Sequence, residues 1–180
     1  MRRQVKSLVA GILRRFGFEL SKTELLERSD DPYHLLSLLI STDTVELIVD
    51  GGASIGNTSA RLSNLFPNSR VFAFEPYPPF IEQLRLKVAE KENIMVMPVA
   101  LDDQTGSKVL KINESEGTSS FFQASDFGRE VYGRLLSQRE AIEVKTTTID
   151  DFASRHHVEK IDLLKLDLQG NELAVINGAS

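Results

Sequence analysis

The feature that most constrains the fold is a set of four short apolar runs with amphipathic segments between them. In this 180-residue chain the runs cover residues 45–49, 70–74, 94–101 and 161–168. Apolar periodicity predicts helices between and after them, over about 57–66, 78–92, 149–156 and from 171 onward. Strands that alternate with helices are typical of βαβ units in a parallel sheet with right-handed crossovers. The sequence therefore predicts an α/β fold.

The chain between the third apolar run and the helical segment over 149–156 shows weaker patterns. A turn over 102–106 leads into a short strand over 107–112, and alternation over 142–147 predicts a strand at the edge of a sheet. Residues 113–140 are polar and rich in Gly and Ser at first, then weakly helical. The stretch GTSSFF, Gly117 to Phe122, lies in this region and is a candidate part of an acceptor site or lid.

Residues 1–41 are predicted to form an N-terminal helical segment, separate from a domain over 42–180. Residues 1–22 hold six bases and one acid, whereas the rest of the chain is acidic. An apolar stripe at helical spacing consists of Val5, Leu8, Val9, Ile12, Leu13 and Phe16. The stripe predicts a helix that packs on the domain or on a partner subunit, with contact to a membrane surface as the weaker alternative. A further helix is predicted from Pro32 to about Ser41.

Composition excludes several classes of function. The chain has no cysteine, which excludes a disulfide framework and a thiolate metal site and favours a cytoplasmic location. Its three histidines, two of them adjacent, argue against a histidine metal site, so no metal is expected. An acidic domain does not suit nucleic acid, because phosphate contacts need clustered Lys and Arg. No apolar run approaches the roughly 18 residues of a membrane span.

A glycine-containing loop follows the first apolar run. It has the sequence VDGGASIG, residues 49–56. Glycines supply positive φ and let the backbone approach a ligand, and the strand–loop–helix context gives the pattern its meaning. Glu75 ends the second run, where an acid can accept hydrogen bonds from both hydroxyls of a ribose. Together these features predict a cofactor that contains a nucleoside.

Two classes of cofactor are compatible with this loop. Dinucleotide sites usually have the pattern G-x-G-x-x-G, whereas Ala53 and Ser54 stand inside the loop here. S-adenosylmethionine carries an ammonium group, which Asp50 can meet at the end of the first strand. The residues by themselves favour S-adenosylmethionine and leave a small dinucleotide-binding domain as an alternative.

An acid stands at the end of each of the four main runs: Asp50, Glu75, Asp102 and Asp167. The carboxyl ends of parallel strands border ligand sites, so these acids are candidate site residues. Asp167 is the candidate general base for a hydroxyl acceptor. Lys165 is predicted to form an ion pair with Asp167 or with another acid at a strand end. His156 and His157 are predicted to end a surface helix rather than to act in catalysis.

Five segments, in order, resemble the FkbM-type family of S-adenosylmethionine-dependent methyltransferases over about residues 45–180. They are VDGGASIGNTS, VFAFEPYPPFIEQL, PVALDDQTGS, TIDDF and IDLLKLDLQGNELAVINGA. The resemblance implies a Rossmann-like class I methyltransferase sheet with flanking helices and S-adenosylmethionine as cofactor. It also implies O-methylation of a hydroxyl on a sugar or natural-product-like acceptor, which would be a small molecule or a glycan.

The resemblance also implies which residues form the site. The cofactor-binding residues would be Asp50, Gly52, Ser54, Gly56, Glu75, Pro76, Ala100, Leu101 and Asp102. The loop residues would surround the methionine part, Glu75 would hold the ribose hydroxyls, and Ala100 to Asp102 would lie near the adenine. Asp167 would face the methionine end and the acceptor. Ser54 stands where the family often has Asn, and Gln169 where it often has Glu.

A sheet of this class has seven strands, so the resemblance predicts that the sheet here is truncated after its fourth main strand. Such a sheet has an unpaired edge, which favours association and a homo-oligomer. A non-catalytic methyltransferase-like interaction module is therefore the alternative function.

Overall fold

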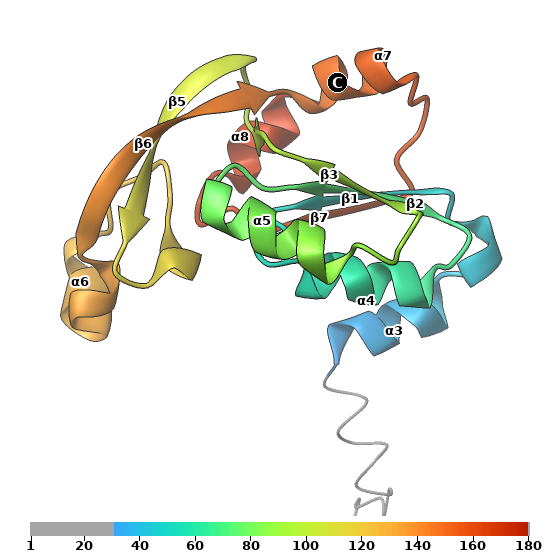
Figure 1. Cartoon of the computed structure of the whole chain (residues 1–180), viewed down its shortest axis with the longest axis horizontal. Helices are drawn as coiled ribbons and strands as arrows, with labels where there is room; N and C mark the ends of the chain where they lie inside the picture. The colour runs from blue at the N-terminus through green and yellow to red at the C-terminus, as the bar shows by residue number, and fades with distance from the viewer. Residues whose placement is uncertain (1–30, 180) are drawn as a thin grey trace, which may run out of the picture. The chain divides into compact units, whose positions relative to one another are not determined.

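The computed structural model describes residues 31–179 (Figure 1). Two compact units divide the chain, Met1–Ser41 and Thr42–Ser180. The stripe from Val5 to Phe16 lies outside the described residues. The predicted helix after it is confirmed as α3 (Pro32–Leu39), because Pro32 occupies the first turn and the Asp31 carboxylate accepts a hydrogen bond from the Tyr33 N–H at 3.1 Å.

The second unit contains a four-stranded parallel sheet in the order β3-β2-β1-β7. Its strands are β1 (Leu47–Gly51), β2 (Arg70–Phe74), β3 (Ile94–Met97) and β7 (Leu163–Leu166). All five residues of β1 are buried, as are the last four of β2. Burial on both faces explains why these strands are continuous apolar runs. A short 3-10 helix, η1 (Thr42–Thr44), precedes β1.

Helices cover both faces of this sheet (Figure 1). They are α4 (Asn57–Leu65), α5 (Pro78–Lys87), α7 (Ile149–His156) and α8 (Glu172–Asn177). Phe72 and Phe74 of β2 meet Phe152 of α7 with ring centroids 4.8 and 5.1 Å apart, whereas Ala73 between them packs with Leu84 of α5. Alternate residues of one strand therefore serve opposite layers.

The run over 94–101 is not one strand, which corrects the prediction. It forms β3 and, after a break at Pro98, the two-residue strand β4 (Ala100–Leu101), which joins a different sheet. Proline has no N–H to donate to a ladder, so pairing with β2 stops at Met97. The break brings Ala100 and Leu101 alongside β6 (Gln138–Thr147), which belongs to a second, three-stranded sheet.

The second sheet has the order β4-β6-β5, with β5 (Gly106–Asn113) antiparallel to β6 (Gln138–Thr147). The prediction of an edge strand over 142–147 is therefore wrong, because β6 is the middle strand and pairs with β4 through Thr146 and Thr147. A two-residue partner strand leaves no recognisable apolar run in the sequence. In this article, β5, β6 and the residues between them are called the arm.

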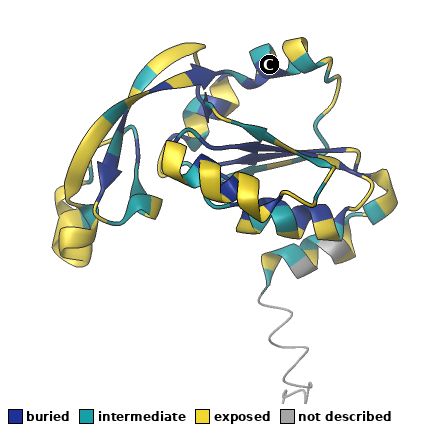
Figure 2. Ribbon diagram, in the orientation of Figure 1, coloured by how far each residue is buried: buried dark blue, intermediate teal, exposed yellow. Residues whose placement is uncertain are grey.

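Short helices connect the two long strands of the arm. They are η2 (Glu116–Thr118), α6 (Asp126–Tyr132) and η3 (Gly133–Leu136). Helix α6 lies at the far end of the arm from the parallel sheet (Figure 1). Most of the outer part of the arm is exposed, whereas β1 and most of β2 are buried (Figure 2).

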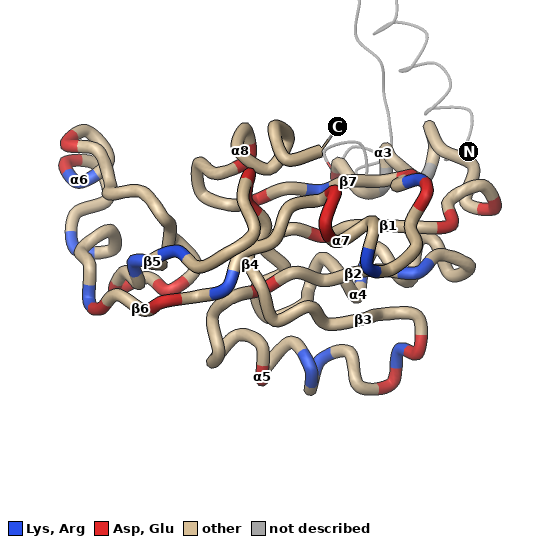
Figure 3. Tube along the Cα trace, turned by 90° about the horizontal axis from the view of Figure 1, so that it is seen from above, with Lys and Arg blue, Asp and Glu red and all other residues tan. Residues whose placement is uncertain are grey.

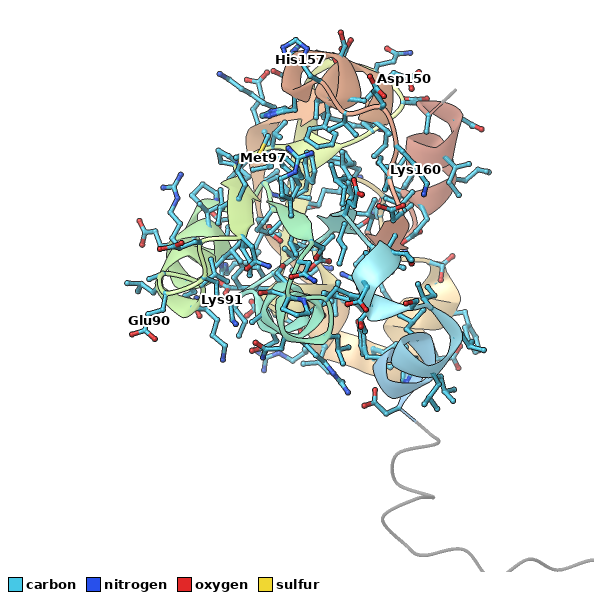
Figure 4. The ribbon with its side chains drawn as sticks, turned by 90° about the vertical axis from the view of Figure 1, so that its right-hand side faces the viewer. Glu90, Lys91, Met97, Asp150, His157 and Lys160 are labelled. Carbon is cyan, nitrogen blue, oxygen red and sulfur yellow. The ribbon has the colours of Figure 1, made fainter. Side chains whose placement is uncertain are left out.

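Helix α7 ends as the sequence predicts. Its last residue is His156, and His157 follows in the left-handed conformation with φ of 53°. His157 lies at the outer surface, at the end of α7 away from the sheet (Figure 4). The ring of His156 packs 5.4 Å from that of Phe72. Both histidines therefore lie at the end of α7, and neither borders the cavity described below. None of the helices over residues 31–179 is long and apolar enough to cross a membrane.

Candidate functional site

A cavity opens where β1, β2 and β7 end, and the arm forms its opposite wall. It measures about 730 Å³ with its open mouth included. Segments after three parallel strands border it, together with β4 and the segment from Glu116 to Phe121. The cavity therefore lies at the carboxyl edge of the parallel sheet, where α/β folds bind their ligands.

Glu75 is the central carboxylate of this cavity. Its side chain is 6% exposed, and its two oxygens accept one backbone hydrogen bond each, from Ser54 N–H and Tyr77 N–H, both at 2.9 Å. Burial raises the pKa of Glu75 above its usual 4.5, although the two backbone bonds and the charge of Lys165 act against the rise. The carboxylate is fixed in place and has lone pairs left for ligand hydroxyls.

The loop after β1 approaches the end of β7 so closely that only glycine fits at residue 52. Gly52 has φ of +72°, and a Cβ there would lie 2.1 Å from the backbone oxygen of Asp167. The N–H groups of Gly52 and Ala53 both donate to the carbonyl of Phe74, at 3.1 and 2.9 Å. Gly52 and Ser54 border the cavity, as does Pro76 beside Glu75.

Gly56 does not border the cavity. It precedes α4 with φ of +88°, and a Cβ would lie 2.5 Å from Cδ1 of Leu84. The glycine therefore lets the start of α4 pack closely against α5.

Asp50 is fully buried beneath the loop and does not border the cavity either. Its Oδ2 accepts a hydrogen bond from Ser59 Oγ at 2.6 Å, and its Oδ1 lies 2.9 Å from Lys165 Nζ. The predicted ion pair of Lys165 is thus confirmed, with Asp50 as the partner. The predicted direct contact between Asp50 and a cofactor is not supported, because the Asp50 side chain does not reach the cavity.

Asp167 and Gln169 border the cavity at the end of β7. Gln169 donates from Nε2 to Asp167 Oδ1 at 3.1 Å and has a positive φ of 54°. Its backbone carbonyl accepts a hydrogen bond from Ser120 Oγ of the arm at 2.8 Å. Glu172 accepts from the N–H groups of Leu168 and Gly170, so it closes the turn into α8. The Asp167 carboxylate is exposed and borders the cavity.

Ala100 and Leu101 border the cavity, whereas Asp102 does not. Asp102 is buried and pairs with Lys108 Nζ at 2.9 Å, and its Oδ1 accepts from Asn171 Nδ2 at 3.2 Å. Burial opposes ionisation of Asp102, but the hydrogen bonds from Lys108 and Asn171 outweigh it and lower its pKa. Asn171 itself borders the cavity, so Asp102 acts on the site through Asn171.

The arm and the start of α5 supply cavity residues that the sequence analysis did not single out. Tyr77 donates from its hydroxyl to Glu116 Oε1 at 3.2 Å, and Arg139 donates to the same carboxylate at 2.8 Å and to the Tyr77 hydroxyl at 3.0 Å. Tyr77 and Glu116 both border the cavity. They lie 39 residues apart in the chain. No local pattern could have paired them.

The stretch GTSSFF divides between the cavity and solvent. Gly117, Ser119, Ser120 and Phe121 border the cavity, which fits the predicted place of this loop. Phe121 also lies 4.8 Å from Lys108 Nζ, in a cation–π contact. Phe122 is 52% exposed. Among residues 31–179, no three His, Cys, Asp or Glu side chains group together in a way that could hold a metal ion.

The fold and the site together define a class of protein. A parallel sheet with a glycine turn after its first strand and a buried acid after its second is the arrangement of Rossmann-like domains that bind nucleoside cofactors. Comparison with known proteins narrows the class. Residues 50–180 match the model of the methyltransferase FkbM domain, and the chain belongs to this family.

Individual relatives agree with this assignment. The chain is 29% identical over 149 residues to the 2-O-methyltransferase NoeI of Sinorhizobium fredii, covering 80% of this chain and 60% of NoeI. It is 22% identical over 142 residues to Methyltransferase 1 of Beauveria bassiana, covering 73% of this chain and 57% of that protein. The chain thus spans roughly three fifths of the length of these two relatives.

A solved structure supports the fold. The methyltransferase FkbM from Methylobacillus flagellatus superimposes with a TM-score of 0.51 at 20% identity, over 83% of this chain and 33% of that one. This likeness concerns the α/β architecture with its mostly parallel sheet.

Proposed function

We propose that the protein is an S-adenosylmethionine-dependent O-methyltransferase, and that its acceptor is a hydroxyl group on a sugar or natural-product-like molecule. The observation that carries the proposal is the position of Glu75, fixed by two backbone hydrogen bonds and bordering the cavity. Family membership supplies methyl transfer as the reaction class. The printed name of NoeI, a 2-O-methyltransferase, supports a hydroxyl acceptor.

The residues of the cavity fit the proposed cofactor. Glu75 offers acceptor oxygens to a ribose diol, and Ala100 and Leu101 offer a flat apolar wall beside Asn171 for an adenine. The Nδ2 group of Asn171 donates to the Leu101 carbonyl and to Asp102 Oδ1. Its Oδ1 is buried without a hydrogen-bond partner among the described residues. An orphaned acceptor in this wall suits a base that carries an amino group.

The proposed mechanism uses few residues of this chain. When bound, the cofactor supplies a methyl group activated by its sulfonium. The cavity wall holds the two reactants in line and limits the access of water, which is the main help a protein gives to such a displacement. Asp167, exposed at the end of β7, would take the proton that the acceptor hydroxyl loses when it is methylated.

The test is calorimetric titration of the 180-residue chain with S-adenosylhomocysteine and, separately, with NAD. Binding of S-adenosylhomocysteine without binding of NAD is expected, and binding of NAD alone would overturn the proposal in favour of a dinucleotide-binding domain. If neither binds, the interaction-module alternative is favoured.

A second assay addresses the acceptor. Transfer of a labelled methyl group to a panel of methyl glycosides and polyhydroxylated natural products is expected to give labelled ethers. Asp167→Asn should retain binding of S-adenosylhomocysteine and lose about 100-fold in rate, the usual size of a general-base contribution. Loss of binding in this variant would instead assign Asp167 to the cofactor.

Location and assembly also remain proposals. A cytoplasmic location is supported by the absence of cysteine from the sequence. Association into a homo-oligomer is supported by the position of β7 at an edge of the parallel sheet.

A further inference from the structure

Lys165 has an unusual set of partners for a lysine of the parallel sheet. It lies on β7 directly beside Asp50 of β1 in the parallel register. Its Nζ lies 2.9 Å from Asp50 Oδ1 and donates to the backbone carbonyls of Gly51 at 3.1 Å and Gly52 at 3.0 Å. The ammonium thus combines an ion pair with one buried carboxylate and hydrogen bonds to two consecutive carbonyls.

These contacts act on the loop that borders the cavity. The carbonyls of Gly51 and Gly52 accept hydrogen bonds from the ammonium. These bonds fix the peptide group between Gly51 and Gly52 and the one between Gly52 and Ala53. Fixed peptide groups set the direction of the Gly52 and Ala53 N–H groups toward Phe74 O. The loop conformation is therefore determined by the Lys165 ammonium, which binds its carbonyls, and by the Phe74 carbonyl of β2, which binds its N–H groups.

The same contacts account for the burial of Asp50. An ionised carboxylate with no exposed surface needs a charge partner and hydrogen bonds, which Lys165 and Ser59 provide. Neither oxygen of Asp50 faces the cavity, because Asp50 does not border it. Asp50 and Lys165 also act in opposite directions on the pKa of Glu75, the acid raising it and the lysine lowering it.

We propose that Lys165 is the positioning residue of the cofactor loop. Asp50 serves as the buried counter-ion that keeps the ammonium in place and does not itself contact the cofactor. The inference rests on the proposed function in one respect, that the loop after β1 receives the methionine part of the cofactor. It predicts that loss of Lys165 weakens binding of that part and leaves binding of the nucleoside part nearly unchanged.

The decisive variant is Asp50→Asn/Lys165→Met, which removes both charges together and keeps the side chains close to their original size. Lys165→Met alone leaves a buried carboxylate without a cation and is expected to unfold at a lower temperature. The double variant avoids this defect, so its unfolding midpoint should be closer to that of the original chain. It still lacks the donor that holds the two carbonyls.

Binding is measured with two ligands that differ only at the methionine end, S-adenosylhomocysteine and 5′-methylthioadenosine. In the double variant, the dissociation constant of S-adenosylhomocysteine should rise about tenfold or more, because hydrogen bonds to a charged group are lost. That of 5′-methylthioadenosine should stay within about threefold. Equal weakening of both ligands, or of neither, would overturn the inference.

A ligand-free measurement separates this inference from the proposed function. Hydrogen exchange of the Gly52 and Ala53 amides should be at least about tenfold faster in the double variant, with exchange in α7 unchanged. Unchanged exchange in the loop contradicts the inference even if no ligand binds. Absence of ligand binding by the original chain contradicts the proposed function alone.

Lys160→Met is the matched control. Lys160 is also a cation near β1 and β7, but it pairs with Asp162 before β7 begins, at the opposite end of the strands from the loop (Figure 4). It should leave both dissociation constants and the loop exchange unchanged.

Discussion

The parallel sheet and the arm are built from the same chain by different means. Strands β1 and β2 are buried along almost their whole length, whereas the first four residues of β6 are all exposed. Charged residues of both signs follow one another along β6, and β5 carries two lysines, as Figure 3 shows. The parallel sheet is held together by apolar packing on two faces. The arm relies on its strand ladder, on polar contacts and on one apolar cluster that includes Leu110, Ile112 and Val144.

The difference bears on how the two regions form the site. The sheet provides a rigid edge on which Glu75 and the glycine loop are placed. The arm closes the cavity through individual hydrogen bonds, such as Ser120 to Gln169 and Arg139 to Tyr77. We therefore expect substitutions in the sheet to affect stability first, and those in the arm to affect ligand binding first. The following experiments test this contrast.

Truncation of a core phenylalanine should have the largest effect. Phe152 is 2% exposed and its ring packs edge-on against Phe72 and Phe74. Phe152→Ala should lower the free energy of unfolding by about 3–5 kcal/mol, the usual cost of such a cavity. Phe127 of α6, 75% exposed, is the matched control in the arm, and Phe127→Ala should change stability by less than about 0.5 kcal/mol. Urea unfolding measures both, and similar losses would refute the contrast.

Addition of a single methyl group should separate two glycines. Gly52→Ala forces a Cβ against the Asp167 carbonyl at a positive φ, so we expect a loss of about 3 kcal/mol together with loss of S-adenosylhomocysteine binding. Gly106→Ala, at the start of β5, meets no atom within 4 Å and should be neutral. Thermal unfolding with and without ligand measures both variants. A stable Gly52→Ala chain that binds normally would show that the close approach to β7 is not required.

The pH dependence of binding should report on Glu75. Burial raises its pKa above 4.5, and the ionised form is the better acceptor for ribose hydroxyls. Affinity for S-adenosylhomocysteine should therefore fall as the pH is lowered through that raised pKa. In the free protein the sign is opposite, because the folded state holds the proton more tightly than the unfolded state, so the contribution of Glu75 to stability declines as pH rises from 4.5 through the raised pKa. Titration calorimetry and urea unfolding between pH 4.5 and 8 measure the two slopes, and Glu75→Gln should abolish both.

Substitution of Arg139 in the arm should have the smallest effect on folding. Arg139 hydrogen-bonds to Glu116, which lowers the pKa of that carboxyl below its usual 4.5. Arg139→Met should leave the unfolding temperature almost unchanged, because exposed ion pairs contribute little to stability. Affinity for S-adenosylhomocysteine should drop by about threefold, since Tyr77 and Glu116 lose their common partner at the cavity wall. A large loss of stability would show that the arm contributes to the core. Arg129→Met on α6 serves as the control.

The sequence predicts the parallel sheet well because its strands are local apolar runs with recognisable turns after them. The run at 70–74 and the helix from residue 57 are found where they are expected, whereas β1 extends to Gly51 and α5 ends at Lys87, before the expected residue 92. The predictions for β4 and β6 fail for a common reason. The two-residue strand after Pro98 carries no local signal, and the edge or central position of β6 depends on that strand as its partner.

The site follows the same division. Glu75, Gly52 and Asp167 stand at strand ends that the sequence identifies, and the structure places all three at the cavity. Tyr77, Glu116 and Asn171 could not be found in this way, because long-range contacts bring them to the wall. Burial decides which strand-end acids face the cavity: it places Asp50 and Asp102 behind the wall, each with a lysine.

The sequence by itself determined the α/β class, the family resemblance and the strand-end residues of the site, since these depend on short-range patterns of apolar, glycine and acidic residues. Only the tertiary structure decided that Lys165 holds Asp50 and the glycine loop, and that the arm closes the cavity. Those contacts join residues as far apart in the chain as Gly51 and Lys165, and their energies depend on burial and distance, which exist only once the chain has folded.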